Sequence, residues 1–398
     1  MKVTKSYKYR LYPNNKQQEL LNKTFGCVRF YWNNLTETFN SYDKESNPSP
    51  KFKTQKELKK DYEWLSEVSA AALQQKKRDF DEAKNQYFNK NRKALIGRMK
   101  FKSKRNKQSY RLPNQKFKIG PNKIRLEKIG FVKMVMEREL PINSKLLSVT
   151  VSRNSSGEYY ASINFETEQK VKNKKSKENV GIDLGLKEIA TLSNGLQFHN
   201  PKVFIKNQCE LAKAQRHLSR KKKGSNRYKK QARKVAKIHQ SITNKRDWHL
   251  HNISKFIVEN FNEIGMEDLC VKGMVKNKRL SKSISDTSMS KLKQLIAYKQ
   301  KEYDKEVKLL GRYEPSTKEC HGCGSIQVMA LSDREFVCEN CGEVTMDRDW
   351  NAAIVIRNKT VGVNAVQQTW SNIKTKLHHD VKWQLLRSVE NNNNIICH

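Results

Sequence analysis

Apolar positions divide the first 170 residues into a helical part and a β part. The run VTKSYKYRL at 3–11 alternates like a short strand, and a proline ends it. Apolar residues then recur at helical spacing over 15–42 and again over 54–89, so we expect an all-α segment of roughly 14–95. Residues 100–170 hold short β-like runs, of which LLSVTVSRNSSGEYYASINFET predicts a hairpin. We expect a small β-barrel or sheet there, which the first strand joins.

A second pattern begins after a charged linker at 170–178. The run NVGIDLGLKEIATLSNGLQF predicts two strands with a turn between them, and 205–260 is helical in its spacing. FNEIGMEDL predicts another short strand. Helices are expected in DTSMSKLKQLIAYKQKEYDKE and from DRDWNAAIVIRN onward. The pattern fades beyond about residue 361, where the end VENNNNIICH predicts disorder. The chain therefore has the pattern of a multidomain α+β protein.

The charge balance changes the interpretation of this fold. Lys and Arg number 80 against 40 Asp and Glu, which gives a net charge of +40. A compact fold with that charge repels itself unless a polyanion binds, and nucleic acid is the first candidate, ahead of an anionic membrane surface. No apolar run approaches the roughly 18 residues of a membrane span, and MKVTKSYKYRLYP lacks the apolar core of a signal peptide. We predict a cytoplasmic protein with no membrane partner.

The positive charge is most concentrated at 211–240, which contains 12 Lys or Arg and no acid. A solvated helix face usually mixes both signs, so a stripe of one sign indicates phosphate contact. A purely solvated surface is the alternative. Such contacts give affinity without a sequence code. The candidate phosphate contacts are Lys221, Lys222, Lys223, Arg227, Lys229 and Lys230.

Four of the eight cysteines form two C-x-x-C pairs that are 14 residues apart. Each pair supplies two thiolates to one tetrahedral Zn²⁺, and four thiolates leave no open position for a substrate, so the zinc is structural. Four free cysteines are the alternative, and His321 is expected to be a surface residue. The proposed zinc ligands are Cys320, Cys323, Cys338 and Cys341. The others are expected to be free thiols, mainly buried: Cys27, Cys209, Cys270 and Cys397.

Three acids lie in three different settings. Asp183 lies in an apolar strand, Glu267 at the end of another, and Asp349 at the start of a helix. A buried carboxylate is costly unless it is paired or binds a cation, although any one of these could be a hydrogen-bonded core residue. Together they can converge on two Mg²⁺ ions about 4 Å apart and hydrolyse a phosphodiester. Asp268 should point to the opposite strand face, and Asp347 should cap the helix or support the site.

The ordered motifs GIDLGLKEIATLSNG, LSRKKKGSNRYKK, EDLCVKGMVKN, CHGCG, LSDREFVCENCG and DRDWNAA resemble TnpB over about residues 5–357. TnpB proteins are the RNA-guided nucleases of bacterial insertion sequences, similar to type V CRISPR effectors. The resemblance implies a β-barrel wedge domain at 1–13 and 100–175 and an α-helical recognition domain at 14–99. It also implies an RNase H-like (RuvC) α/β nuclease domain at 179–316 and 346–360. A zinc ribbon at 317–345 would bind target nucleic acid, and 361–398 would be a tail.

The resemblance also implies an activity, RNA-guided cleavage of DNA beside a short adjacent motif. The family's catalytic, magnesium-binding acids fall on Asp183, Glu267 and Asp349, its zinc ligands fall on the four paired cysteines, and Gln74 would approach the adjacent motif. The partners would be a guide RNA from the transposon end, one protein per RNA, and double- and single-stranded target DNA. The alternatives are a nuclease-inactive, guide-directed repressor, a zinc-ribbon RNA-binding protein and a strand-transfer transposase.

Overall fold

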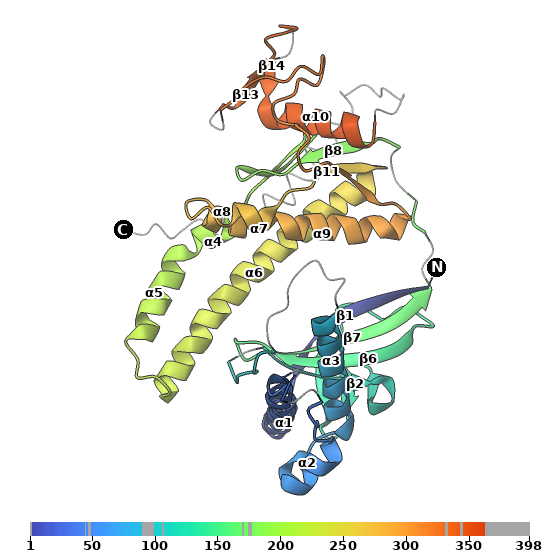
Figure 1. Ribbon diagram of the computed structural model, residues 1–398, viewed down its shortest axis with the longest axis vertical. Helices are drawn as coiled ribbons and strands as arrows, with labels where there is room; N and C mark the ends of the chain where they lie inside the picture. The colour runs from blue at the N-terminus through green and yellow to red at the C-terminus, as the bar shows by residue number, and fades with distance from the viewer. Residues whose placement is uncertain are drawn as a thin grey trace. The chain divides into compact units, whose positions relative to one another are not determined.

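A computed structural model describes residues 2–43, 45–46, 49–89, 99–105, 107–168, 171–173, 177–330, 333–342 and 345–362 (Figure 1). The chain divides into two compact units, Met1–Lys170 with Ala232–Lys237, and Val171–Gln231 with Ile238–His398. The tail predicted from residue 361 lies outside the described residues from 363 onward, as does part of the predicted linker. Among the described residues, no helix is both long enough and apolar enough to cross a membrane.

The first unit contains a seven-stranded antiparallel sheet in the order β2-β6-β7-β1-β5-β4-β3. The edge strands β2 and β3 are joined by only the three residues of η2, so the sheet must curl until its edges approach, like a nearly closed barrel. The predicted hairpin is confirmed as β6 and β7, and β1 joins the sheet between β7 and β5. The strands are β1 (Lys2–Tyr12), β2 (Gln108–Pro113), β3 (Phe117–Gly120), β4 (Lys123–Leu126), β5 (Gly130–Val135), β6 (Lys145–Arg153) and β7 (Tyr159–Glu168).

The helices of the first unit share one apolar core with this sheet. They are α1 (Asn15–Asn40), α2 (Gln55–Asp61), η1 (Glu63–Ser66) and α3 (Ala70–Phe88), with η2 at Asn114–Lys116. The single helical stretch predicted over 54–89 is wrong, because the backbone leaves the helical conformation at Tyr62 (φ −139°, ψ 90°). Aromatic contacts stabilise this break in the helix: the ring centroid of Phe30 lies 4.9 Å from that of Tyr62 and 5.0 Å from that of Trp64.

The second unit is built on a five-stranded sheet in the order β10-β9-β8-β11-β12. The first three strands along the chain form an antiparallel meander, and β11 and β12 run parallel to β8. Two strands were predicted in 179–198 and three are present, and the edge strand β12 was not predicted. The strands are β8 (Val180–Asp183), β9 (Glu188–Leu192), β10 (Gln197–His199), β11 (Ile264–Glu267) and β12 (Val307–Leu310).

Alternation along β8 and β11 assigns the two faces of this sheet. The core shared with α6 (Asn226–Asn260) and α9 (Met289–Gln300) includes Val180, Ile182, Ile264 and Met266. The intervening Gly181 and Gly265 face α10 (Arg348–Thr360), which lies beside β8 and β11 in Figure 1. A Cβ at Gly181 would lie 2.1 Å from the carbonyl oxygen of Ala353, so only glycine lets α10 pack this close. The helix that carries Asp349 is thereby pressed against the two strands that carry the other acids.

The remaining elements are mostly helical. They are α4 (Val203–Lys206), α5 (Gln208–Ser219), α6 (Asn226–Asn260), α7 (Val271–Met274), α8 (Ser281–Thr287), α9 (Met289–Gln300), η3 (Lys301–Tyr303), β13 (Glu335–Val337), β14 (Thr345–Asp347) and α10 (Arg348–Thr360). Of the scattered cysteines, Cys27 is buried as expected, whereas Cys209, on the surface of α5, and Cys270, directly before α7, are exposed. Cys397 lies outside the described residues.

Candidate active site and metal centre

Two of the three predicted acids end neighbouring parallel strands. Ile182 of β8 pairs with Met266 of β11, so Asp183 and Glu267 are the next residues in both strands. The carboxyl ends of parallel strands meet at one edge of a sheet, where ligands bind in open α/β folds. Asp183 was predicted within its strand and instead ends it. At this position the Asp183 side chain is half-buried at the carboxyl edge of the sheet, so part of the cost of burying a carboxylate remains.

Asp349 joins them from the first turn of α10. The Asp347 side chain caps this helix, with Oδ1 accepting the backbone N–H groups of Asp349 and Trp350 at 3.0 Å each. The capping role expected for Asp347 is confirmed. A Cβ at Gly185 would lie 4.0 Å from Asp349 Oδ2, so Asp349 faces the residues that directly follow Asp183. The structure therefore brings the three acids to one edge of the sheet.

The three carboxylates repel one another. Burial, and then the charges of Glu267 and Asp349, raise the pKa of Asp183 well above its usual value. Arg348 and the backbone N–H of Leu184 lower that pKa and offset only part of the rise. A cluster of carboxylate oxygens with excess negative charge fits hard divalent cations such as Mg²⁺. The three acids are the residues that would hold them.

The potential metal ligands of the second unit include the three acids and the paired cysteines. Within the described ranges, the four cysteines are the one group of three or more potential ligands whose atoms all lie within 4.8 Å of one another. The neighbouring Asp268 takes no part, because its oxygens accept Lys293 Nζ and Arg312 Nη2 at 2.8 Å each. These hydrogen bonds lower the pKa of Asp268.

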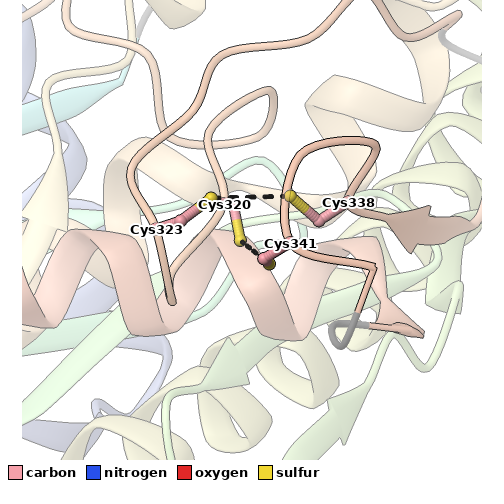
Figure 2. A group of neighbouring side chains, drawn as sticks. All are labelled: Cys320, Cys323, Cys338 and Cys341. Atoms are coloured by element: carbon pink, nitrogen blue, oxygen red, sulfur yellow. Dashed lines mark hydrogen bonds between the residues drawn. The ribbon is translucent and has the colours of Figure 1, made fainter.

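The paired cysteines converge as predicted (Figure 2). The Sγ atoms of Cys320 and Cys341 lie 3.9 Å apart, and those of Cys323 and Cys338 lie 3.6 Å apart. The pKa of Cys323 is lowered to about 5, mainly by a hydrogen bond with the Ser325 side chain. The thiolate form that binds zinc is thereby favoured. Four such sulfur atoms at this spacing fit one tetrahedral Zn²⁺.

Two residues beside this cluster have roles that the sequence did not predict. His321 was expected at the surface, but its backbone N–H donates to Asn351 Oδ1 at 3.1 Å and its Nδ1 lies 3.0 Å from the same oxygen. Ser316 is buried and donates its hydroxyl to Glu267 Oε1. Neither contact has a sequence signature, because each depends on how distant segments pack.

The basic segment forms the α5–α6 hairpin, and all twelve of its Lys and Arg residues are exposed. In the part of the chain that the structure describes, none of the twelve forms an ion pair with a carboxylate. Their apolar neighbours Leu211, Val235 and Ile238 are buried, which turns the basic side chains outward. Gln74 is exposed on α3. Nucleic-acid contact by these residues stays a prediction.

The raised pKa of Asp183 makes a prediction about stability. A carboxyl group whose pKa is raised on folding stabilises the fold at low pH and loses that contribution as the pH rises through its folded pKa. At pH 7 without metal, Asp183→Asn should therefore raise the melting temperature, by at least roughly 2 °C if it gains about 1 kcal/mol. The gain should disappear below pH 4, where the wild-type carboxyl is protonated. Melting curves of both proteins in a chelator test this, and a lower melting temperature for the variant at pH 7 would contradict it.

Three known protein families match successive parts of this sequence. The family described as "Probable transposase" matches residues 162–278, and the "Cas12f1-like, TNB domain" family matches 290–356. A "Helix-turn-helix domain" family matches 1–44, where the structure has β1 and α1.

Two relatives match nearly the whole chain. One from Streptomyces pristinaespiralis, named "Putative RNA-guided DNA endonuclease", is 35% identical over 364 residues, 88% of each chain. Another from Escherichia coli K12, named "Putative RNA-guided DNA endonuclease InsQ", is 30% identical over 380 residues, 89% of this chain and 91% of the relative. Among solved structures, a chain of the cryo-EM structure of the Cas12f1–sgRNA–target DNA complex aligns over 90% of this chain and 99% of its own. Its TM-score is 0.45 and its identity 13%, too low to bear on function.

Proposed function

Because this chain belongs to the TnpB family, we propose that it is an RNA-guided DNA endonuclease of an insertion sequence. The observation that carries the proposal is the meeting of Asp183, Glu267 and Asp349 at the carboxyl edge of β8 and β11. The proposed reaction is Mg²⁺-dependent hydrolysis of a target phosphodiester beside a short adjacent motif. Cleavage of DNA that matches the bound guide RNA tests it, with Asp183→Ala protein as the inactive control.

The topology of the second unit supports an RNase H-like, RuvC-type nuclease domain. Its sheet has a three-stranded antiparallel meander followed by two strands parallel to the first, which is the arrangement expected of that fold. The segment between β12 and α10 holds the cysteine cluster and would be the inserted zinc ribbon. The nearly closed sheet of the first unit would be the wedge domain, and α1 to α3 the recognition domain.

The residues of the site have distinct parts in the proposed chemistry. Two bound Mg²⁺ ions would supply an activated water and stabilise the leaving 3′ oxygen. Asp183 and Glu267 project from a rigid sheet edge, and Asp349 is fixed by the Asp347 cap, so the three ligands are held in place before substrate arrives. Arg348 Nε lies 3.6 Å from Asp349 Oδ1, where it offsets part of the negative charge.

The α5–α6 hairpin would bind nucleic acid through its phosphates. Its exposed lysines and arginines fit a polyanion of any sequence, whereas sequence recognition would come from the guide RNA. We propose that one protein binds one guide RNA from the transposon end, and that Gln74 lies near the adjacent motif of the DNA. A protein with these partners would act in the bacterial cytoplasm.

Neutralising the hairpin tip should weaken nucleic-acid binding in a salt-dependent way. Replacing Lys221, Lys222 and Lys223 by glutamine should reduce the slope of log K against log salt by about 2 to 3, because each lost phosphate contact removes roughly 0.7–0.9. Fluorescence anisotropy with labelled guide RNA at several salt concentrations measures this.

A matched control removes the same charge elsewhere in the second unit. Lys291, Lys305 and Lys308 are ion-paired with Asp247 or Glu263, so their replacement by glutamine should change the slope much less. Equal slopes for the two triple variants would mean that the hairpin lysines do not contact phosphate.

A further inference from the structure

The chain that enters the cysteine cluster first touches a carboxylate of the candidate active site. Ser316, three residues before Glu319 and four before Cys320, is 5% exposed and donates its hydroxyl to Glu267 Oε1. A hydroxyl buried on an acid fixes the rotamer of that acid and selects which of its oxygens remains open. The orientation of Glu267 therefore depends on the placement of the segment at 315–321.

The same segment is bonded to the helix that carries Asp349. Asn351 is 0% exposed, and its Nδ2 donates to the carbonyl oxygen of Glu319 at 2.6 Å while its Oδ1 accepts the His321 backbone N–H at 3.1 Å. The buried Asn351 amide thus makes three polar contacts with the residues on both sides of Cys320, Glu319 and His321. These contacts restrict the motion of α10 relative to the segment that holds Cys320. Farther along α10, Lys359 Nζ donates to the Glu319 carboxylate and, at 3.3 Å, to the Pro315 carbonyl.

The other half of the cluster reaches the start of α10. The Arg348 backbone N–H donates to the Arg334 carbonyl at 2.8 Å, and Arg348 Nη1 donates to the Ala330 carbonyl at 3.3 Å. Strand β14 pairs with β13 and runs directly into the helix. A metal that joins the two cysteine pairs would thus hold both arms of the cluster against α10.

We propose that Ser316 and Asn351 are positioning residues, through which the cysteine cluster holds Glu267 and Asp349 at the spacing that divalent cations require. The inference rests on the proposed function, because it concerns the same carboxylate site. It makes zinc in the cluster and divalent cations at the carboxylates thermodynamically coupled, so that each raises the affinity for the other.

Direct metal binding tests the proposal without a cleavage assay. Full-length, zinc-loaded protein free of nucleic acid is titrated with Mn²⁺, and the binding that Asp183→Asn abolishes is assigned to the carboxylates. Ser316→Ala and Asn351→Ala should each weaken that binding about 10- to 100-fold, the usual range for residues that orient metal ligands. Ser316→Thr, which keeps the hydroxyl, should restore it. Asn358→Ala is the matched control, because Asn358 is exposed on α10 and contacts its neighbour Arg357.

The coupling is measured with one further variant. Cys338→Ser should weaken Mn²⁺ binding, and adding Asn351→Ala to it should weaken binding little further, since both changes break the same link. Zinc content and melting temperature separate this from unfolding: Ser316→Ala should keep its zinc and its melting transition. If both Ser316→Ala and Asn351→Ala bind Mn²⁺ with wild-type affinity, the positioning role is overturned and the proposed function is unaffected. Absence of carboxylate-dependent Mn²⁺ binding in the wild type would overturn the metal site of the proposed function, and the inference with it.

Discussion

Asp183→Ala protein is expected to lose DNA cleavage by about 10³-fold or more while it still binds guide RNA and matching DNA. Losing one of the acids that would hold the Mg²⁺ ions would remove several kcal/mol of transition-state stabilisation, and about 4 kcal/mol corresponds to a factor of 10³. Glu267→Ala and Asp349→Ala should have the same effect, because both carboxylates lie close enough to Asp183 to raise its pKa and are proposed to hold the same metal ions. Cleavage kinetics under single-turnover conditions measure the loss, and gel-shift assays measure the binding.

The neighbouring acid provides the control for this result. Asp268 follows Glu267 directly but is paired with Lys293 and Arg312, so Asp268→Asn should change the cleavage rate only a few-fold. Retained cleavage in any one of the three alanine variants would remove that residue from the site. Equal losses in Asp268→Asn and Asp183→Ala would indicate a general effect of charge.

Cys338→Ser is expected to have the second large effect, on the fold of the cysteine cluster. Structural zinc contributes roughly 10–16 kcal/mol of binding free energy in small zinc-dependent folds, and a serine hydroxyl is a poor zinc ligand. Among the described residues, the apolar contacts beside the four cysteines are few, mainly Phe336 and Met329, and could not replace a lost zinc ion. The variant should lose about one equivalent of zinc and most of its DNA cleavage, as measured by elemental analysis and the cleavage assay.

Another cysteine shows whether this effect is specific. Cys209 is an exposed free thiol on α5, so Cys209→Ser should keep both zinc and cleavage. A Cys338→Ser protein with full zinc content and full activity would refute a structural zinc at these four cysteines.

Local sequence signals predicted the parts of the site that depend on residue spacing. The C-x-x-C pairs gave the cysteine cluster, since chelation by four thiolates needs little beyond two tight turns, and Gly324 and Gly342 provide these with φ of 74° and 64°. Asp183 and Glu267 were identified because carboxylates in apolar strands are costly. Asp347 was expected to cap or support the helix, and it caps it.

The sequence could not predict contacts that depend on packing between distant segments. Nothing in the sequence around Ser316 distinguishes it from other serines, because its contact with Glu267 arises only when β11 and β12 pair. Asn351 and His321 are 30 positions apart, and their contact requires the whole cluster to fold back on α10. The short strands β10 and β12 were missed because most of their residues lie outside the core, so they lack the buried apolar run that identified the equally short β8 and β11. The helix break at Tyr62 was missed because its aromatic contacts lie outside the local sequence.

Guide-dependent cleavage tests the central claim most directly. The protein is expressed together with its native insertion-sequence DNA and purified, and the RNA bound to it is sequenced. The complex is then incubated in Mg²⁺ with a library of DNA targets that match or mismatch the guide. We predict one discrete RNA and cuts only in matching targets beside a common short motif, with no cuts by Asp183→Ala protein. A discrete RNA that directs DNA binding without any cut would contradict the nuclease account and indicate a guide-directed repressor.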